Sequence, residues 1–494
     1  MKLFSRGSAR IAILMAIAIG VHVTICLSLH YQFLNPLFYI STHAKGQGGC
    51  FFGIYQAGVN LMNGESIYGC ETYRTPTELA VPFYHFYRYL PFTSYVSSVF
   101  TKVLGPWQAY WFWIVINEII LAACILLTLR LRDRFGRTAI VVATFWLLFS
   151  PFYVELYMGQ FCFVMAFFIF LILYPYLRGT APQKSNAGLL AEAVTASNPN
   201  GYNIIAQARA YDPGAGADHG ICRDSAPGTL PPRNHQAQHG SGRSHGWVAP
   251  LCWVLSVLLK SFTALYSLTL FRIGKKKLAL AGIAAVILTS APYFAMHPQD
   301  LRWFLHLNFQ PLPSYSVGGC LGFCSLLRDM SDRLLASVSM QGINLGFFDI
   351  SARNVPIALI LAAIFITTFL ITIRKRTIDP LSNITLWTLT FFLVFKDIWE
   401  YHYVMLLPLF VGFYLQTRSK YLLVLFILLA VPTPFFLYDI PTSEHPQVYW
   451  STPLSIMHHS FKAVPTLLFY LWVVRRELRE AGGYRRLLAF GGAG

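Results

Sequence analysis

The stretch IVINEIILAACILLTL (Ile114–Leu129) decides the fold class of this chain. Nearly all of its residues are apolar, and with its flanking aromatic residues it reaches the roughly 20 helical residues that span a bilayer core. Similar runs occupy Phe163–Leu177 and Val355–Thr372. Hydrophobic residues make up 55% of the 494-residue chain and charged residues 12%, whereas soluble proteins carry about 25% charged residues. The sequence therefore predicts an all-α polytopic membrane protein.

The basic residues indicate which ends of the apolar segments face the cytoplasm. They occur in short groups beside apolar runs, such as RLRDRFGR (130–137), RIGKKK (272–277) and RRELRE (475–480). This placement explains the formal net charge of +17 through membrane orientation and anchoring, without nucleic-acid binding. If every group is cytoplasmic, both termini are cytoplasmic and the chain forms a bundle of about 12 transmembrane helices. The expected crossings lie near 11–30, 106–129, 138–152, 160–177, 247–260, 262–272, 278–295, 354–373, 381–396, 402–417, 420–437 and 453–474.

Two places depart from simple crossings. YLPFTSYVSSVFTKVLG (Tyr89–Gly105) is apolar, but counting it as a crossing would move RLRDRFGR to the outer side. We therefore expect an amphipathic helix in the outer interface. The runs 247–260 and 262–272 are each too short to span, and Lys260 lies at their junction. This pattern predicts a broken helix with Lys260 facing protein near the outer leaflet, the alternative being a lysine that extends to the interface from a helix end.

The remaining regions set the domain organisation. We expect an N-terminal membrane region (1–178) with outer loop 31–105, and a C-terminal membrane region (247–494) with outer loop 296–353. Between them, residues 179–246 are rich in Gly, Ala, Pro, Ser and His and lack hydrophobic periodicity, which predicts a disordered cytoplasmic insertion. In the first outer loop, Cys50 and Cys70 either stay free or form a disulfide worth about 3 kcal/mol.

Several chemical signatures are missing from the sequence. It contains no phosphate-binding loop, no dinucleotide-binding glycine fingerprint, no HExxH and no DxD pair. An ATP-driven pump or an enzyme using nucleotide sugars is therefore disfavoured, and no metal or cofactor is expected. By contrast, FKDIWEYHYVMLLP (Phe395–Pro408) places Lys396, Asp397, Glu400 and His402 within seven residues between two apolar segments.

Within the crossing at 106–129, Glu118 is a further ionisable side chain. A carboxylate there is costly unless it is paired or protonated. With Asn117 it is expected to form an inter-helix hydrogen-bonding pair.

Four motifs in order along the chain resemble one enzyme family. They are FFGIYQAGVNLMNGESIYGC (Phe51–Cys70) followed by FYRYLPF, then Gly159–Gln160, then VLLKSFTALYSL around Lys260, and finally Trp399, Glu400 and His402 before Leu407–Pro408. They are similar to motifs of GT-C superfold glycosyltransferases that use polyprenol-phosphate sugars, in the family 87 branch related to mycobacterial α-1,2-mannosyltransferases. The resemblance covers most of the chain outside 179–246.

The resemblance implies transfer of mannose or a pentose from a polyprenyl-phosphate donor to an envelope glycolipid or glycan. The reaction would take place on the outer face of the cytoplasmic membrane. One position departs from the family: Phe51 stands where the family usually has the Asp taken to be the catalytic base. The loop 31–105 contains no Asp, and its acids are Glu65, Glu71 and Glu78.

The chemistry of such a transfer selects candidate residues. A carboxylate or imidazole must activate the acceptor hydroxyl, and cations must stabilise the departing phosphate. We expect His402 and Glu400 to activate the acceptor, with Glu71 and Glu78 as substitutes. Lys260 and Arg88 are expected to bind the donor phosphate. The residues expected to line the cavity are Tyr55, Tyr89, Gln160, Glu155, Lys396 and Asp397.

Other readings stay open at this point. Glu400 could be a helix-capping acid, and His402 an interfacial histidine with its hydrogen bonds satisfied. The whole protein could instead be a transporter or flippase of a lipid-linked saccharide, or a catalytically inactive relative. A transporter is expected to show hydropathy symmetry between its halves. The polar loops 31–105 and 296–353 have no such matching partners.

Overall fold

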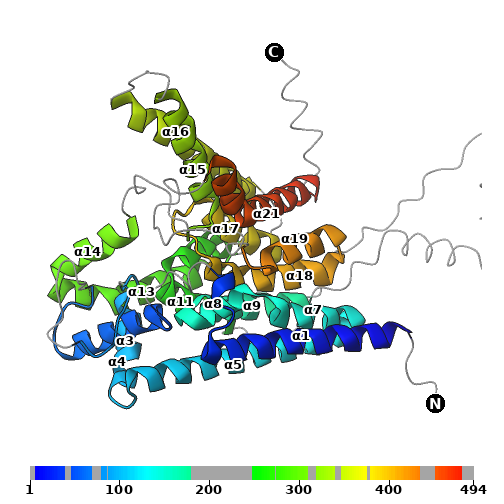
Figure 1. Cartoon of the computed structure of the whole chain (residues 1–494), viewed down its shortest axis with the longest axis horizontal. Helices are drawn as coiled ribbons and strands as arrows, with labels where there is room; N and C mark the ends of the chain where they lie inside the picture. The colour runs from blue at the N-terminus through cyan, green and yellow to red at the C-terminus, as the bar shows by residue number, and fades with distance from the viewer. Residues whose placement is uncertain are drawn as a thin grey trace, which may run out of the picture. The chain divides into compact units, whose positions relative to one another are not determined.

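A computed structural model gives the structure of the chain (Figure 1). It describes residues 6–38, 46–68, 79–85, 87–179, 248–272, 274–309, 319–339, 347–374, 379–433 and 451–480. Within these ranges the regular secondary structure is helical, apart from a single antiparallel bridge between Cys320 and Trp399. The predicted all-α class is confirmed. Apart from Gly179, the predicted insertion at 179–246 lies outside the described residues.

Nine helices are described before the insertion. They are α1 (Arg6–Tyr31), η1 (Asn35–Leu37), α3 (Gly49–Met62), α4 (Pro91–Thr101), α5 (Pro106–Arg130), α6 (Arg132–Phe135), α7 (Arg137–Leu148), α8 (Pro151–Met158) and α9 (Cys162–Gly179).

The described residues after the insertion continue with helices that belong to the same compact unit. They are α11 (Val248–Leu259), η3 (Ser261–Tyr266), α12 (Ser267–Arg272), α13 (Lys276–Met296), α14 (Pro298–Phe309), α15 (Phe323–Ser339), α16 (Phe347–Arg374), α17 (Pro380–Val394), η4 (Glu400–Leu406), α18 (Leu407–Thr417), α19 (Lys420–Ala430) and α21 (Thr452–Glu480).

Local sequence explains where several helices begin. Proline stands in the first turn of α4, α5, α8 and α17, where the missing N–H costs no helical hydrogen bond. Before α17, the Asp379 carboxylate accepts hydrogen bonds from the backbone N–H groups of Leu381 and Ser382. Residues next to each helix start therefore determine where these helices begin.

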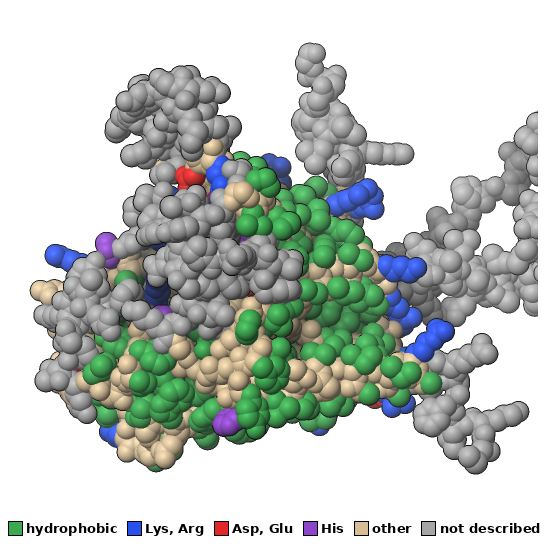
Figure 2. Space-filling view, viewed as in Figure 1, with side chains coloured by type: hydrophobic (Ala, Val, Ile, Leu, Met, Phe, Trp, Pro, Cys, Tyr) green, Lys and Arg blue, Asp and Glu red, His purple; other side chains and the backbone are tan. Residues whose placement is uncertain are grey.

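The outward faces of the long helices are apolar. Large aliphatic side chains are exposed on α1, α5, α13 and α16, and green hydrophobic side chains cover much of the face in Figure 2. Among the described residues, five helices are long and apolar enough to cross a membrane: α1 (over Ala9–Tyr31), α5, α9, α13 and α16 (over Asn354–Arg374). The pair α7 and α8, bent by 49°, adds a sixth if it is one broken span. An exterior of this kind belongs to a membrane-associated protein.

Polar groups gather inside the helix assembly instead. The hydroxyls of Tyr266 and Thr388 lie 2.6 Å apart, and those of Thr368 and Thr390 lie 2.7 Å apart, each pair joining two helices. Such contacts between hydroxyls are typical of helix packing in membranes. Every residue of α8 and η4 is buried, and so are Leu381–Leu393 of α17. These buried elements form the core that positions the candidate site.

Each predicted crossing overlaps a helix or a broken pair of helices within the described residues, which end at Thr433 in the crossing predicted at 420–437. A count of about 12 spans stays a prediction. The break at Lys260 is confirmed, because α11 ends at Leu259 and η3 begins at Ser261. Tyr89–Gly105 contains α4, whose 11 residues are too few to span. Its buried residues include Thr93, Ser94 and Ser97. The predicted interfacial position of α4 stays a prediction.

Candidate functional site

The turn between α8 and α9 is the structural centre of the site. Gly159 adopts a left-handed conformation (φ +65°), and a Cβ atom there would lie 2.5 Å from the Cβ atom of Phe51. Only glycine therefore lets α3 approach the turn this closely. The Tyr89 hydroxyl donates to the Gln160 Oε1 atom at 2.7 Å, and the Trp113 indole donates to the Gln160 carbonyl at 3.3 Å. These bonds hold the Gln160 side chain and backbone in place.

Lys260 reaches the same turn from the break between α11 and η3. Its backbone is extended (φ −144°, ψ 113°), and the side chain is half-buried. The Nζ atom lies 2.9 Å from the Cys162 Sγ atom and 5.8 Å from the ring centre of Tyr401. Lys260 therefore faces protein, as the sequence predicted, with an ammonium group between α9 and η4.

His402 lies in η4, which packs against α8 and α9. The backbone N–H of Trp399 donates to the His402 Nδ1 atom at 2.9 Å. Because Nδ1 accepts, the neutral ring carries its proton on Nε2. The ring is buried, and the charges of Lys260 and Arg88 both act on it. This arrangement suits His402 to donate a hydrogen bond through Nε2 rather than to accept a proton.

Glu400, two residues earlier, is bound to a different part of the protein. Its Oε1 atom accepts the backbone N–H of Thr433 at 3.0 Å and lies 3.6 Å from the Lys462 Nζ atom on α21. Burial raises the pKa of this carboxyl, against the opposing effects of Lys462 and the Thr433 hydrogen bonds. These contacts give Glu400 a structural role that joins η4 to α21. Its predicted role in activating an acceptor has no test here.

Glu155 is the carboxylate that lies beside Lys260. The side chain is 1% exposed, and its Oε1 atom accepts the backbone N–H of Phe163 at 2.8 Å. Its Oε2 atom accepts no hydrogen bond from the described residues. The charge of the Lys260 ammonium acts on the carboxylate, and the backbone and thiol of Cys162 act on it through hydrogen bonding. Sequence reasoning assigned Glu155 only to the cavity lining, whereas this geometry leaves one carboxylate oxygen available.

Cys50 and Arg88 approach the turn from the segments before α4. Burial raises the pKa of the Cys50 thiol to about 12, against a hydrogen bond from Gln160 and the charges of Lys260 and Arg88. The predicted Cys50–Cys70 disulfide stays a prediction, because its second cysteine lies outside the described residues. Cys70, Glu71 and Glu78 lie outside the described residues. The Arg88 Nη1 atom forms an ion pair with the Asp397 Oδ2 atom at 3.3 Å.

The structure thus brings together side chains from distant parts of the sequence. We call this group the Lys260 cluster and define it as Arg88, Tyr89, Glu155, Gln160, Lys260 and His402. The charges of Arg88 and Lys260 act on His402, and the charge of Lys260 also acts on Glu155. Such a cluster can bind a phosphate through its cations and exchange a proton with a neighbouring hydroxyl.

Of the other predicted lining residues, Asp397 contacts the cluster directly, and the contacts of Lys396 and Tyr55 place their segments. Asp397 pairs with Arg88, while the Lys396 carbonyl accepts from Ser325 at 3.3 Å and holds α15 against this turn. The Tyr55 hydroxyl donates to the Leu104 carbonyl at 2.8 Å and so joins α3 to the chain before α5. Phe51 packs among aromatic rings and stacks on Trp113 with ring centres 6.4 Å apart.

Sequence reasoning missed two parts of the site. Cys162 was not singled out, although it contacts Lys260, and the turn that presents His402 is held by a second segment. There the Leu321 N–H donates to the Ile398 carbonyl at 2.7 Å, and a Cβ atom at Gly319 would clash with the Trp399 ring at 1.8 Å. The glycine pair in SVGGC was the available signal for this close approach.

No protein-family model matches the chain, and no curated protein matches it.

Proposed function

We propose that this protein is a multi-pass membrane glycosyltransferase that takes mannose or a pentose from a polyprenyl-phosphate donor. The acceptor is an envelope glycolipid or glycan, and the reaction occurs on the outer face of the cytoplasmic membrane, with both termini in the cytoplasm. The observation that carries the proposal is the Lys260 cluster, which joins two cations, a buried carboxylate and a histidine within an apolar helix assembly. The four motifs shared with GT-C transferases supply the substrate class.

The residues of the cluster divide between the two halves of the reaction. The acceptor hydroxyl forms a bond to the anomeric carbon while the bond from that carbon to the phosphate oxygen breaks. Lys260 and Arg88 neutralise the charge that develops on the departing phosphate. The Nε2–H of His402 donates to the same phosphate, since Nδ1 already accepts from Trp399.

The acceptor proton needs a base, and Glu155 supplies it in this proposal. Its Oε2 atom accepts no hydrogen bond from the described residues, and the charge of Lys260 offsets part of the cost of burying the carboxylate. Phe51, which stands where related enzymes have their Asp, lies against the turn that follows Glu155. In this proposal, Glu155 on α8 therefore takes the role of the missing Asp as the base for the acceptor hydroxyl. We favour Glu155 over Glu400, because Lys462 and Thr433 already engage the Glu400 carboxylate.

The test compares Glu155→Gln with the wild type in lipid nanodiscs, using radiolabelled polyprenyl-phosphate sugars and envelope lipid extract as acceptor. We expect a loss of about 10²- to 10⁴-fold in kcat, the usual contribution of a general base. Glu65→Gln, a change in the half-exposed turn after α3, is the matched control and should keep full activity. Full activity of Glu155→Gln would reject Glu155 as the base, and no transfer from any such donor would reject the function.

A further inference from the structure

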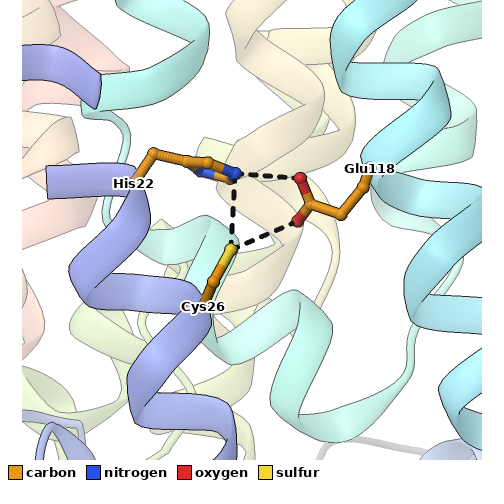
Figure 3. Close-up of side chains that lie close together, drawn as sticks. All are labelled: His22, Cys26 and Glu118. Atoms are coloured by element: carbon orange, nitrogen blue, oxygen red, sulfur yellow. Dashed lines mark hydrogen bonds and ion pairs between the residues drawn. The ribbon is translucent and has the colours of Figure 1, made fainter. Parts of the chain in front are cut away.

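Helices α1 and α5 bring together three ligand-type side chains that are not part of the Lys260 cluster (Figure 3). His22 and Cys26 are four residues apart on α1, so they share one face of the helix. Glu118 points toward them from α5. The His22 Nε2 atom lies 2.9 Å from the Glu118 Oε2 atom, and the Cys26 Sγ atom lies 3.5 Å from His22 Nε2 and 3.8 Å from Glu118 Oε1.

These contacts differ from the expected pairing of Glu118 with Asn117. The Asn117 amide donates to the Trp113 carbonyl of its own helix at 2.9 Å. Glu118 instead reaches across to α1, and its side chain stays 32% exposed. The His22 ring packs against Phe152 with ring centres 6.0 Å apart. The three side chains therefore form a separate cluster between helices.

The separations between the three ligand-type atoms are close to those between the ligands of a tetrahedral metal ion. Zinc binds nitrogen and oxygen at about 2.0–2.1 Å and sulfur at about 2.3 Å, so tetrahedral ligand atoms lie roughly 3.3–3.6 Å apart. Both separations from Cys26 Sγ are within about 0.3 Å of this range. The His22–Glu118 separation would open by roughly 0.5 Å on binding. An imidazole, a thiolate and a carboxylate are all ligands that zinc accepts.

Charge balance also favours a divalent cation. Glu118 lies near the middle of α5, a helix that is long and apolar enough to cross a membrane. A half-exposed carboxylate there is costly unless it is paired, and its partner in this structure is the His22 ring. With one divalent ion, the Cys26 thiolate and the Glu118 carboxylate supply two negative charges while the His22 imidazole stays neutral. The complex then has no net charge, as suits a site between two helices with apolar outer faces.

We propose that His22, Cys26 and Glu118 bind one divalent transition-metal ion, with zinc as the best match. Binding releases the Cys26 thiol proton to solvent and forms bonds from the ion to Nε2, Sγ and a carboxylate oxygen. Three protein ligands leave the fourth tetrahedral position for water or another ligand. The ion would fix α1 to α5. This inference does not depend on the proposed glycosyltransferase activity.

The experiment counts metal on untagged full-length protein. Protein in detergent is loaded with zinc and dialysed, and zinc per chain is measured by mass spectrometry. We expect one zinc per chain in the wild type and at least about tenfold weaker zinc binding in Cys26→Ser and in Glu118→Gln. Cys124→Ser, a cysteine change elsewhere on α5, is the matched control and should bind as the wild type does. Equal zinc content in the wild type and Cys26→Ser, or none in the wild type, would overturn the proposal.

A second measurement keeps the proposal testable if a variant fails to fold. Cobalt replaces zinc in tetrahedral sites and reports a sulfur ligand by a near-ultraviolet charge-transfer band. We expect that band, with the visible bands of tetrahedral cobalt, in the wild type and in Cys124→Ser. A wild-type spectrum without the sulfur band would also overturn the site. Histidines elsewhere in the chain lack this band, so their metal binding cannot imitate it.

Discussion

Lys260→Met removes the ammonium group of the cluster while keeping most of the side-chain length. The Nζ atom lies 2.9 Å from Cys162 Sγ and 5.8 Å from the Tyr401 ring centre, so the loss of charge falls at the junction of α9 and η4. A hydrogen bond from a charged group contributes about 1.5–3 kcal/mol. We therefore expect kcat/KM to fall about 10- to 150-fold, since roughly 1.4 kcal/mol corresponds to a factor of ten.

The assay is transfer of labelled sugar from polyprenyl phosphate in nanodiscs, with kcat and KM measured separately. If Lys260 acts on the departing phosphate, kcat falls while KM changes little. Lys275→Met, which removes an exposed lysine just before α13, is the matched control and should leave kcat/KM unchanged. A Lys260→Met protein with normal thermal stability and kcat/KM within about threefold of the wild type would refute the assigned role.

Three further predictions test the rest of the site. His402→Gln should keep more activity than His402→Ala, because an amide can still donate a hydrogen bond to phosphate. An equal loss of kcat in both variants would indicate that His402 acts as a base instead. Burial raises the pKa of Glu400 in the folded protein above its unfolded value. Its contribution to stability is therefore complete below the unfolded pKa of about 4.5 and is lost as pH rises through the folded pKa. The melting temperature of the wild type should accordingly fall with rising pH more than that of Glu400→Gln, and parallel curves of melting temperature against pH would contradict this. Gly159→Ala should lower stability by roughly 1–3 kcal/mol in unfolding experiments, because of its positive φ and the clash with Phe51. Gly64→Ala has a similar φ but open space, so a loss of the same size there would assign the effect to backbone strain alone.

Much of the fold follows from signals that are local in the sequence. The length of the apolar runs predicted the helices, and the polar break at Lys260 predicted where α11 ends. Proline residues in the first turn and the capping residue Asp379 are likewise local signals, and they mark where helices start. The bend between α7 and α8 was not predicted, because 138–152 reads as one continuous run; the break falls where Ser150 and Pro151 interrupt the helix.

The site was predictable only in part, because it depends on the direction of side chains. The sequence placed Lys260, Arg88 and Gln160 in one candidate cavity, and they do lie in one cluster. It could not show that the Glu400 carboxylate lies beside Lys462, while the charge of Lys260 acts on Glu155. Both choices depend on how buried helices pack, which no local pattern encodes.

The role of His402 shows a second limit. The sequence supplies an imidazole but not its tautomer, which follows here from one backbone N–H group in the turn at Trp399. A residue that the motif marks as a base is thereby better suited to donate. The cluster at His22, Cys26 and Glu118 likewise needs the packing of α1 against its neighbours, since only the four-residue spacing of His22 and Cys26 is visible in the sequence.

The most direct test of the account measures both products of the proposed reaction on the purified wild-type protein in nanodiscs. Polyprenyl-phosphate mannose and polyprenyl-phosphate pentose are supplied in turn with envelope lipid extract. The account predicts that one donor gives glycosylated product and free polyprenyl phosphate in a ratio of one to one. If neither donor releases polyprenyl phosphate above the level of protein-free nanodiscs, the proposed function is wrong.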